Sequence, residues 1–222
     1  MKSLIIIPAR KGSKRLPNKN IKLLNGKPLI NYTVEHARKL FDDNIICVST
    51  DSNEIKSIVE KTGLKVPFLR PKHLAEDLSS TQEVILDCLD WYKNKKNYIP
   101  DNIILLQPTS PLRKIEYTKK ALKKYNNKLD MVVSVKKSRL NHKTTFAKVG
   151  KQDDIKKIDL DKNLLELNGS VYVINTSSIK NKEISKFSKI KKVTIREEEL
   201  SIDIDTQLDF DICELIIRKS RE

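Results

Sequence analysis

Two clusters of charged side chains, one near each end of the chain, have the residue types and spacing of a binding site. The first follows a run of aliphatic residues and contains five cations, Arg10, Lys11, Lys14, Arg15 and Lys19. The second is a carboxylate pair, Asp203 and Asp205, and alternate side chains of an extended segment face the same side. Cationic side chains bind phosphate oxygens, and carboxylates together with phosphates suit Mg²⁺. Each cluster alone is more often solvated surface, but the combination predicts a site for a triphosphate and a magnesium ion.

The basic cluster differs from the common phosphate-binding loops. It lacks the Gly-x-x-x-x-Gly-Lys-Ser/Thr pattern, and it lacks the Gly-x-Gly-x-x-Gly dinucleotide fingerprint. Phosphate would therefore be held mainly by side chains. Arg10 offers a planar fork of donors and Lys19 a compact point charge.

Buried strands alternating with helices must position these clusters. Aliphatic runs occupy residues 4–7, 45–48, 103–106 and 131–135, and apolar residues recur at helical spacing over residues 29–40, 52–62, 82–93 and 116–125. This alternation predicts an α/β fold of Rossmann-like type, with a mostly parallel sheet and helices on both faces. Such sheets bind ligands at the carboxyl ends of their strands, where the basic loop lies.

The remainder of the chain completes a single predicted domain over residues 1–222. Residues 136–167 have weak periodicity and high charge, which indicates an insertion. Asn168 and Gly169 are expected to form a tight turn before another strand, and Thr206 is expected to cap a last helix.

The overall composition limits the class of protein. The chain carries a net charge of +15, but this excess comes largely from scattered lysine pairs, and aromatic residues make up only 5% of the sequence. We therefore expect no nucleic-acid partner, although a basic chain attracts phosphate backbones. The three cysteines have no metal-ligand or disulfide spacing, and we find neither a leader nor a long apolar segment. These features predict a cytoplasmic protein without a membrane segment.

Several strings in the chain together resemble CMP-N-acylneuraminate synthetases, the acylneuraminate cytidylyltransferases, in the sialic and legionaminic acid branch. The strings are Ile7-Pro8-Ala9-Arg10, Gly12-Ser13-Lys14, Lys19-Asn20, Gln107-Pro108-Thr109-Ser110-Pro111-Leu112-Arg113, Asn168-Gly169-Ser170-Val171-Tyr172 and Ser201-Ile202-Asp203-Ile204-Asp205. The Gln107 string is the most specific of them. The resemblance implies a fold of the nucleotide-diphospho-sugar transferase type.

The resemblance also implies roles for individual residues. Contacts to CTP are expected from Arg10, Ser13, Lys19, Asn20, Arg70, Ser79 and Thr81. The sugar is expected to contact Gln107, Asn168 and Tyr172, and Mg²⁺ to bind Asp203 and Asp205. Arg10, Asp203 and Asp205 are the expected catalytic residues. Simpler structural roles exist for some of these residues, because hydroxyl groups before a helix also act as caps and Asn-Gly is also a good turn.

The implied reaction is transfer of CMP from CTP to the anomeric hydroxyl of a nonulosonic acid, a sialic-acid-like sugar, with release of pyrophosphate. The alternatives are the same chemistry on legionaminic or pseudaminic acid, and a noncatalytic protein that binds nucleotides or nucleic acid. The resemblance further implies a homodimer formed through residues 136–167, with Lys143 and Phe146 near the contact. The chain departs from the family before Asn168, where Leu165-Glu166-Leu167 replaces an expected arginine, so the cation for the sugar carboxylate is left open.

Overall fold

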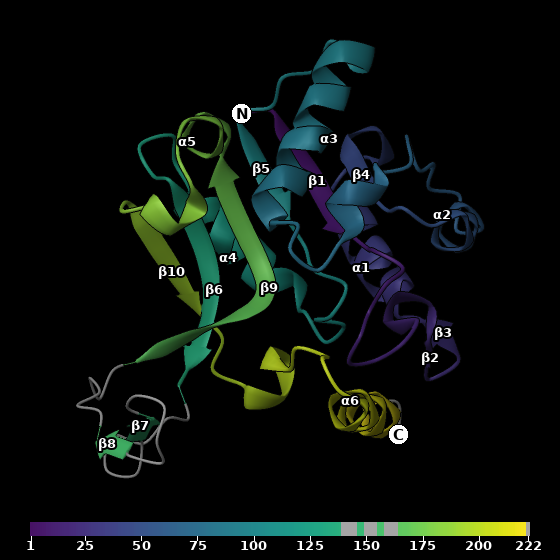
Figure 1. The fold of residues 1–222 in the computed structure, drawn as a ribbon, viewed down its shortest axis with the longest axis vertical. Helices are drawn as coiled ribbons and strands as arrows, with labels where there is room; N and C mark the ends of the chain where they lie inside the picture. Colours follow the sequence, from purple (N-terminus) through teal and green to yellow (C-terminus); the bar gives the residue numbers. More distant parts are fainter. Residues whose placement is uncertain (139–145, 149–154, 158–163, 221–222) are drawn as a thin grey trace.

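The computed structural model describes residues 1–138, 146–148, 155–157 and 164–220 (Figure 1). A six-stranded sheet has the order β10-β6-β9-β5-β1-β4. Its strands are β1 (Ser3–Pro8), β4 (Ile46–Ser49), β5 (Asn102–Leu105), β6 (Met131–Lys137), β9 (Leu165–Asn175) and β10 (Ile190–Thr194). Short antiparallel pairs are formed by β2 (Leu23–Leu24) with β3 (Lys27–Pro28) and by β7 (Phe146–Lys148) with β8 (Ile155–Lys157).

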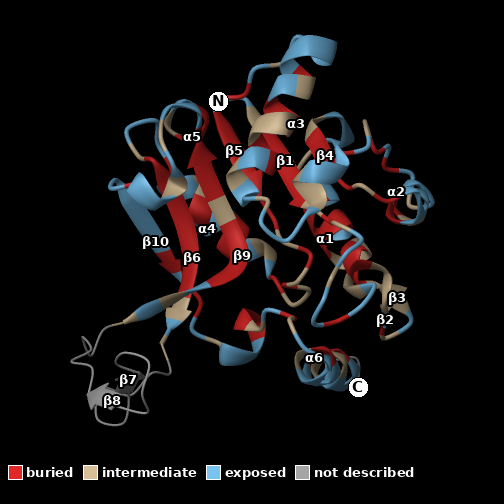
Figure 2. Ribbon diagram, viewed as in Figure 1, coloured by how far each residue is buried: buried red, intermediate tan, exposed pale blue. Residues whose placement is uncertain are grey.

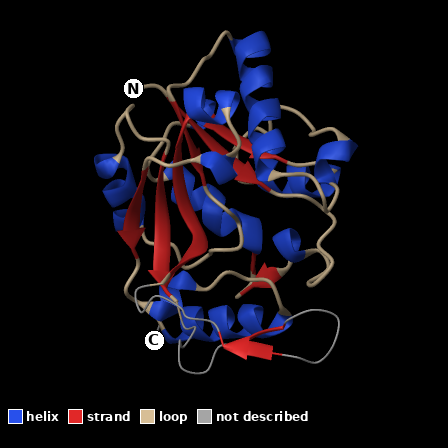
Figure 3. Ribbon diagram, turned by 60° about the vertical axis from the view of Figure 1, so that its left-hand side comes forward, coloured by secondary structure: helices blue, strands red, loops and turns tan. Residues whose placement is uncertain are grey.

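Helices connect the strands and lie on both sides of the sheet (Figure 3). They are α1 (Leu29–Arg38), α2 (Asn53–Glu60), α3 (Thr81–Lys96), α4 (Ile115–Lys124), α5 (Thr176–Asn181) and α6 (Gln207–Lys219). Strand β9 is antiparallel to both β5 and β6, whereas the pairs β1–β4, β1–β5 and β6–β10 are parallel. The predicted α/β fold with a mostly parallel sheet is therefore confirmed.

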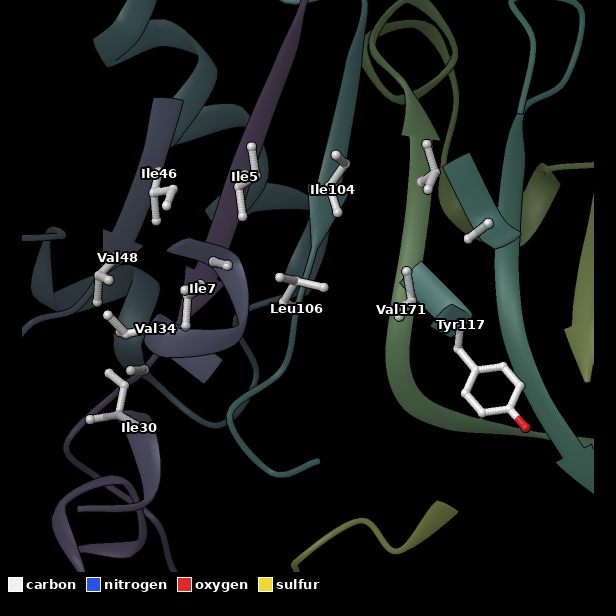
Figure 4. Close-up of a cluster of buried hydrophobic side chains, with 14 of the residues drawn as sticks. Ile5, Ile7, Ile30, Val34, Ile46, Val48, Ile104, Leu106, Tyr117 and Val171 are labelled. Carbon is white, nitrogen blue, oxygen red and sulfur yellow. The ribbon is translucent and has the colours of Figure 1, made fainter. Parts of the chain in front are cut away.

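The strand β1 is buried on both faces because its aliphatic side chains alternate between two core clusters. Ile5 and Ile7 pack in one cluster with Ile30 and Val34 of α1 (Figure 4). Leu4 and Ile6 pack on the opposite face, in the cluster that includes Ile85 and Leu89 of α3. Figure 2 shows the central strands buried and the outer surfaces of the helices exposed. Removal of this apolar surface from water fixes the central strands in place.

Side-chain caps fix where three of the helices begin. The Ser52 hydroxyl accepts a bond from the Ile55 amide at the start of α2. Capping boxes start α3, between Ser80 and Glu83, and α6, between Thr206 and Asp209. The cap expected from Thr206 is confirmed, and it sets the last helix directly after the acidic segment.

The structure corrects the expectations for residues 136–175. Asn168 and Gly169 do not form a tight turn, because they lie inside β9, where the register with β6 shifts between Val133 and Val135. Gly169 has a φ of +70°, which a glycine adopts at a β-bulge without a steric penalty. The two ends of the expected insertion also extend β6 and β9, since Lys136 pairs with Glu166. Strand β10 and helix α5 were not predicted, because exposed lysines mask the periodicity of β10 and α5 is short.

Asp130, at the start of β6, is a buried carboxylate that joins three segments. It accepts bonds from the Ser178 hydroxyl at 2.7 Å and from the Ser188 and Lys189 amides at 3.0 Å, and it pairs with Lys182 at 2.9 Å. The Lys182 ammonium first, and then the Lys189 amide, lower the pKa of Asp130 well below its usual range. The carboxylate therefore stabilises the fold only while it is ionised.

Asp130→Asn is expected to lower the free energy of unfolding at pH 7 by about 3 kcal/mol. A depressed native pKa gives a contribution that is complete above the ordinary aspartate pKa of about 4 and declines as the pH falls toward the native pKa. The difference between variant and wild type should therefore narrow from pH 7 to pH 3 in urea unfolding. The exposed Asp90 serves as a control, because Asp90→Asn should change stability little at either pH. An equal loss in both variants would contradict the assignment.

Candidate active site

A polar cavity of about 460 Å³ opens at the carboxyl edge of the central strands. Its walls come from the loop after β1, the segment before α3, the loop after β5 and the segment before α6. The lining residues are Pro8, Arg10, Ser13, Lys14, Arg15, Lys19, Asn20, Asp77, Gln107, Pro108, Thr109, Asp203 and Asp205. The two charged clusters at opposite ends of the sequence therefore meet in one cavity.

The sheet topology and two hydrogen bonds of the Ile204 backbone bring the clusters together. The loops after β1 and β5 begin at the same edge of the sheet, because these neighbouring strands are parallel. The Ile204 amide donates to the Thr109 carbonyl at 2.9 Å, and the Lys19 ammonium donates to the Ile204 carbonyl at 2.6 Å. Ile204 is fully buried, so the alternation of the segment turns Asp203 and Asp205 toward the cavity.

The two carboxylates have different surroundings. Asp205 pairs with Lys19 at 3.2 Å and with Arg15 at 3.1 Å. Asp203 opens to solvent on one side, but the protein packed around it raises its pKa, and the charge of Asp205 raises it further, while a bond from Thr109 opposes the shift. A cation between the two carboxylates would relieve this repulsion.

The donor set fits Mg²⁺, which is commonly bound by one or two carboxylates together with phosphate oxygens and water. Among the described residues, no group of three or more His, Cys, Asp or Glu side chains could hold a metal ion. Oxygen ligands beyond Asp203 and Asp205 would therefore come from the substrate and from water.

The opposite wall carries cations that are already paired with a carboxylate. The Arg10 guanidinium contacts Asp77 at 2.8 Å and the Ala75 carbonyl at 3.3 Å, and Lys14 also contacts Asp77. The amide of Asn20 donates to the Arg10 carbonyl at 2.9 Å, which shapes the loop around Arg10. Asn20 thus both lines the cavity and supports the backbone of the basic loop.

A second, smaller cavity of about 240 Å³ adjoins the first one. It is lined by Arg70, Ser79 and Thr81, three of the residues predicted to contact the nucleotide. Arg70 is 5% exposed, and its Nε and Nη2 groups have no hydrogen-bond partner among the described residues. Burial lowers the pKa of this guanidinium, and Asp51 opposes that shift. The Arg70 guanidinium brings positive charge to the wall of this cavity, so the cavity favours a ligand with hydrogen-bond acceptors.

The three residues predicted to bind the sugar lie in different surroundings. Gln107 lines the large cavity. Asn168 is 1% exposed and is not among the described residues that line it; its side chain accepts from Ser134 at 2.7 Å and donates to Ser201 at 3.3 Å. Tyr172 is half-buried, and burial followed by the charge of Asp203 raises its pKa. The amide of Asn168 thus supports the bulge in β9 beside the cavity.

Gly169 leaves space for two side chains of the site. A Cβ atom at this position would lie 2.5 Å from Oε1 of Gln107 and 3.3 Å from Oδ2 of Asp203. The sequence suggested that Gly169 is part of a turn, and only the fold reveals how closely Gln107 and Asp203 approach it. The absence of a side chain here leaves room for the side chains of Gln107 and Asp203 beside β9.

Gly169→Ala is therefore expected to displace the Gln107 amide. Because residue 169 has a positive φ, the alanine should also strain the backbone by about 1 kcal/mol. CTP affinity should stay within about twofold of the wild-type value, whereas KM for the sugar acid should rise about tenfold or more. Gly63→Ala is the matched control, since Gly63 also has a positive φ but lies away from the cavity. Comparable kinetic losses in both variants would contradict the role of Gly169. Steady-state kinetics with each substrate varied in turn measure the difference.

Sequence reasoning gave no role to Arg113 or Asp77. Arg113 ends the proline-containing string after β5, yet it is 7% exposed and donates to three acceptors beneath the site. Asp77 lines both cavities. The string Gln107 to Arg113 was itself the available signal for Arg113, but a sequence does not reveal whether an arginine faces inward.

An α/β sheet with a cationic loop and a carboxylate pair lining one cavity at the carboxyl ends of its strands is typical of α/β proteins that bind phosphate-containing ligands. The family model described as cytidylyltransferase matches residues 4–213. The chain belongs to this cytidylyltransferase family.

Two relatives and one solved structure are similar to nearly the whole of this chain. The CMP-N,N'-diacetyllegionaminic acid synthase of Legionella pneumophila is 34% identical, over 100% of this chain and 99% of the relative. An N-acylneuraminate cytidylyltransferase of Streptococcus agalactiae is 33% identical over 95% of this chain, which matches 52% of the length of that protein. A solved CMP:2-keto-3-deoxy-manno-octonic acid synthetase, complexed with CTP, shares the fold with a TM-score of 0.73 at 18% identity, over 99% of this chain and 100% of that chain.

Proposed function

We propose that this protein transfers CMP from CTP to the anomeric hydroxyl of a nonulosonic acid and releases pyrophosphate. The observation that carries the proposal is the meeting of Arg10 and Lys19 with Asp203 and Asp205 in one cavity beside the Arg70 cavity. The Legionella and Streptococcus relatives, whose names state this chemistry, support the choice of nucleotide and the class of sugar.

The cytosine base is assigned to the smaller cavity. The guanidinium of Arg70 can donate to the acceptors of a pyrimidine ring, and the Thr81 hydroxyl lies in the same wall. Hydrogen bonds in a buried pocket discriminate between bases more strongly than apolar contacts do. The triphosphate is assigned to the larger cavity, where Arg10, Ser13, Lys19 and Asn20 lie.

In the proposed reaction, the anomeric hydroxyl oxygen attacks the α-phosphorus, and the bond from this phosphorus to the pyrophosphate oxygen breaks. Either Asp203 or Asp205 accepts the proton of the hydroxyl, since both carboxylates line the same cavity. Arg10 and Lys19 stabilise the charge that develops on the departing pyrophosphate. Mg²⁺, held by Asp203 and Asp205, would supply neutralisation of phosphate charge.

A pyrophosphate-release assay tests the proposal. CTP is combined with N-acetylneuraminic, N,N'-diacetyllegionaminic and pseudaminic acid in turn, each with and without Mg²⁺. We expect release with CTP, not with UTP, and only when a sugar acid and the metal are both present. The sugar with the highest kcat/KM identifies the substrate, and absence of release with every member of the panel would overturn the proposed function.

We further propose that the protein is a homodimer joined through residues 136–167. Leu165 and Leu167, at the start of β9, are 38% and 60% exposed, and apolar side chains exposed near each other favour an interface. Lys143 lies outside the described residues, and Phe146 belongs to β7, of which only the backbone is described. Sedimentation equilibrium should give twice the mass of 25.6 kDa, and a monomeric mass at micromolar concentration would contradict the assignment.

No helix in the described ranges is long and apolar enough to cross a membrane.

A further inference from the structure

The two cavities of the site share a wall formed by Pro8, Arg10 and Asp77. Arg70 lines one cavity, and the cations of the basic loop line the other. If the proposed function is correct, the base and the triphosphate occupy these two cavities. The ribose connects base and triphosphate in a nucleotide, so it must pass along the shared wall.

The chemistry of this wall singles out Asp77. Proline has no polar side-chain atom, and the guanidinium of Arg10 has donors but no acceptor. Asp77 provides two carboxylate oxygens, which are acceptors for hydroxyl groups. Carboxylates bind ribose hydroxyls in other nucleotide sites for the same reason.

Contacts on both sides hold the Asp77 carboxylate in place. Oδ1 pairs with the Arg10 guanidinium at 2.8 Å, and Oδ2 pairs with the Lys14 ammonium. The loop around it is fastened by a bond from the Ser79 hydroxyl to the His73 carbonyl at 2.6 Å and by the bond from Arg10 to the Ala75 carbonyl. These cations also lower the pKa of Asp77, so the carboxylate is ionised at neutral pH. Each of its oxygens keeps a lone pair for a further donor.

We propose that Asp77 accepts hydrogen bonds from the ribose hydroxyls and makes the enzyme select ribonucleotides over deoxyribonucleotides. This inference rests on the proposed placement of CTP, but not on the identity of the sugar acid. The proposal also gives the Arg10–Asp77 ion pair a function, because it holds the residue that contacts the phosphates beside the residue that contacts the ribose.

Calorimetric titration with CTP, 2′-deoxy-CTP and 3′-deoxy-CTP tests the proposal without a sugar acid. The wild-type protein should bind CTP about 10- to 100-fold more tightly than at least one deoxy analogue, the range expected for a hydrogen bond to a charged group. In Asp77→Ala this ratio should fall to about 1. Loss of the contact to Arg10 affects the phosphates of all three nucleotides alike, so it cancels in the ratio.

Asp90→Ala is the control, because Asp90 is an exposed acidic residue of α3 that lines neither cavity. It also removes one negative charge and should leave the ratio at its wild-type value. A wild-type protein without any preference, or an Asp77→Ala variant that keeps the preference, would overturn the inference alone. Ribose selection without pyrophosphate release from any sugar acid would overturn only the proposed reaction. Failure of the wild-type protein to bind CTP would overturn both.

Discussion

Asp205→Ala is expected to reduce the rate of pyrophosphate release by about 100- to 1000-fold while CTP still binds. Asp205 is one of two carboxylates across the cavity from Arg10, so its loss removes half of the proposed metal site. The same substitution releases Arg15 and Lys19 from their contacts at 3.1 and 3.2 Å. Both cations then remain available for the triphosphate, and CTP affinity should change by less than tenfold.

The two effects are measured separately, by pyrophosphate release with a saturating sugar acid and by calorimetric titration with CTP. Asp211→Ala is the control, because Asp211 is an exposed carboxylate of α6 that bonds only its neighbour Gln207 among the described contacts. It should retain the wild-type rate. Full activity of Asp205→Ala would exclude Asp205 from the metal site. A parallel loss of CTP binding and turnover would indicate instead that Asp205 mainly organises the basic loop.

The central part of the fold could be predicted because its elements are locally encoded. The aliphatic runs around Ile6 and Ile104 become strands buried on both faces, and Thr206 caps the last helix as the sequence predicts. The direction of β9 could not be predicted, because β9 is buried over most of its length, as parallel strands are, and its apolar residues therefore do not reveal its direction. The bulge at Gly169 was mistaken for a turn, since an Asn-Gly pair suits both structures.

The candidate site was predictable where side-chain chemistry is explicit. Charged residues such as Arg10 and Asp205 predict a site for phosphate and metal, and their placement in one cavity agrees with the expectation that the two charged clusters meet. Asn168 shows what such reasoning does not reveal, because its side-chain amide forms hydrogen bonds with the hydroxyl groups of Ser134 and Ser201 inside the protein. Whether a polar side chain faces a ligand or a neighbouring strand depends on tertiary contacts.

Arg113 lies beneath the floor of the site and joins three parts of the protein. Its Nε donates to the Ser170 carbonyl and its Nη2 to the Gln107 carbonyl, both at 2.6 Å, while Nη1 donates to the Thr33 hydroxyl at 3.2 Å. It makes no ion pair with a described carboxylate. Burial lowers its pKa to about 9, and Asp203 opposes that shift, so the guanidinium remains charged at neutral pH. Burial, with a contribution from Arg113, lowers the pKa of the nearby His36 to about 3 and keeps that imidazole neutral.

Arg113→Met is therefore expected to lower the free energy of unfolding by about 2–4 kcal/mol, because the carbonyls of Gln107 and Ser170 lose their donor inside the protein. Gln107 and the bulge in β9 should shift together, so kcat/KM for the sugar acid should fall about 100-fold, with CTP affinity less affected. Arg113→Lys retains the charge but cannot bridge three acceptors, and it should recover only part of either loss. Arg218→Met, on the exposed face of α6, is the control for urea unfolding and kinetics. If Arg113→Met loses stability while the folded variant keeps wild-type kcat/KM, Arg113 supports the fold without positioning the substrate.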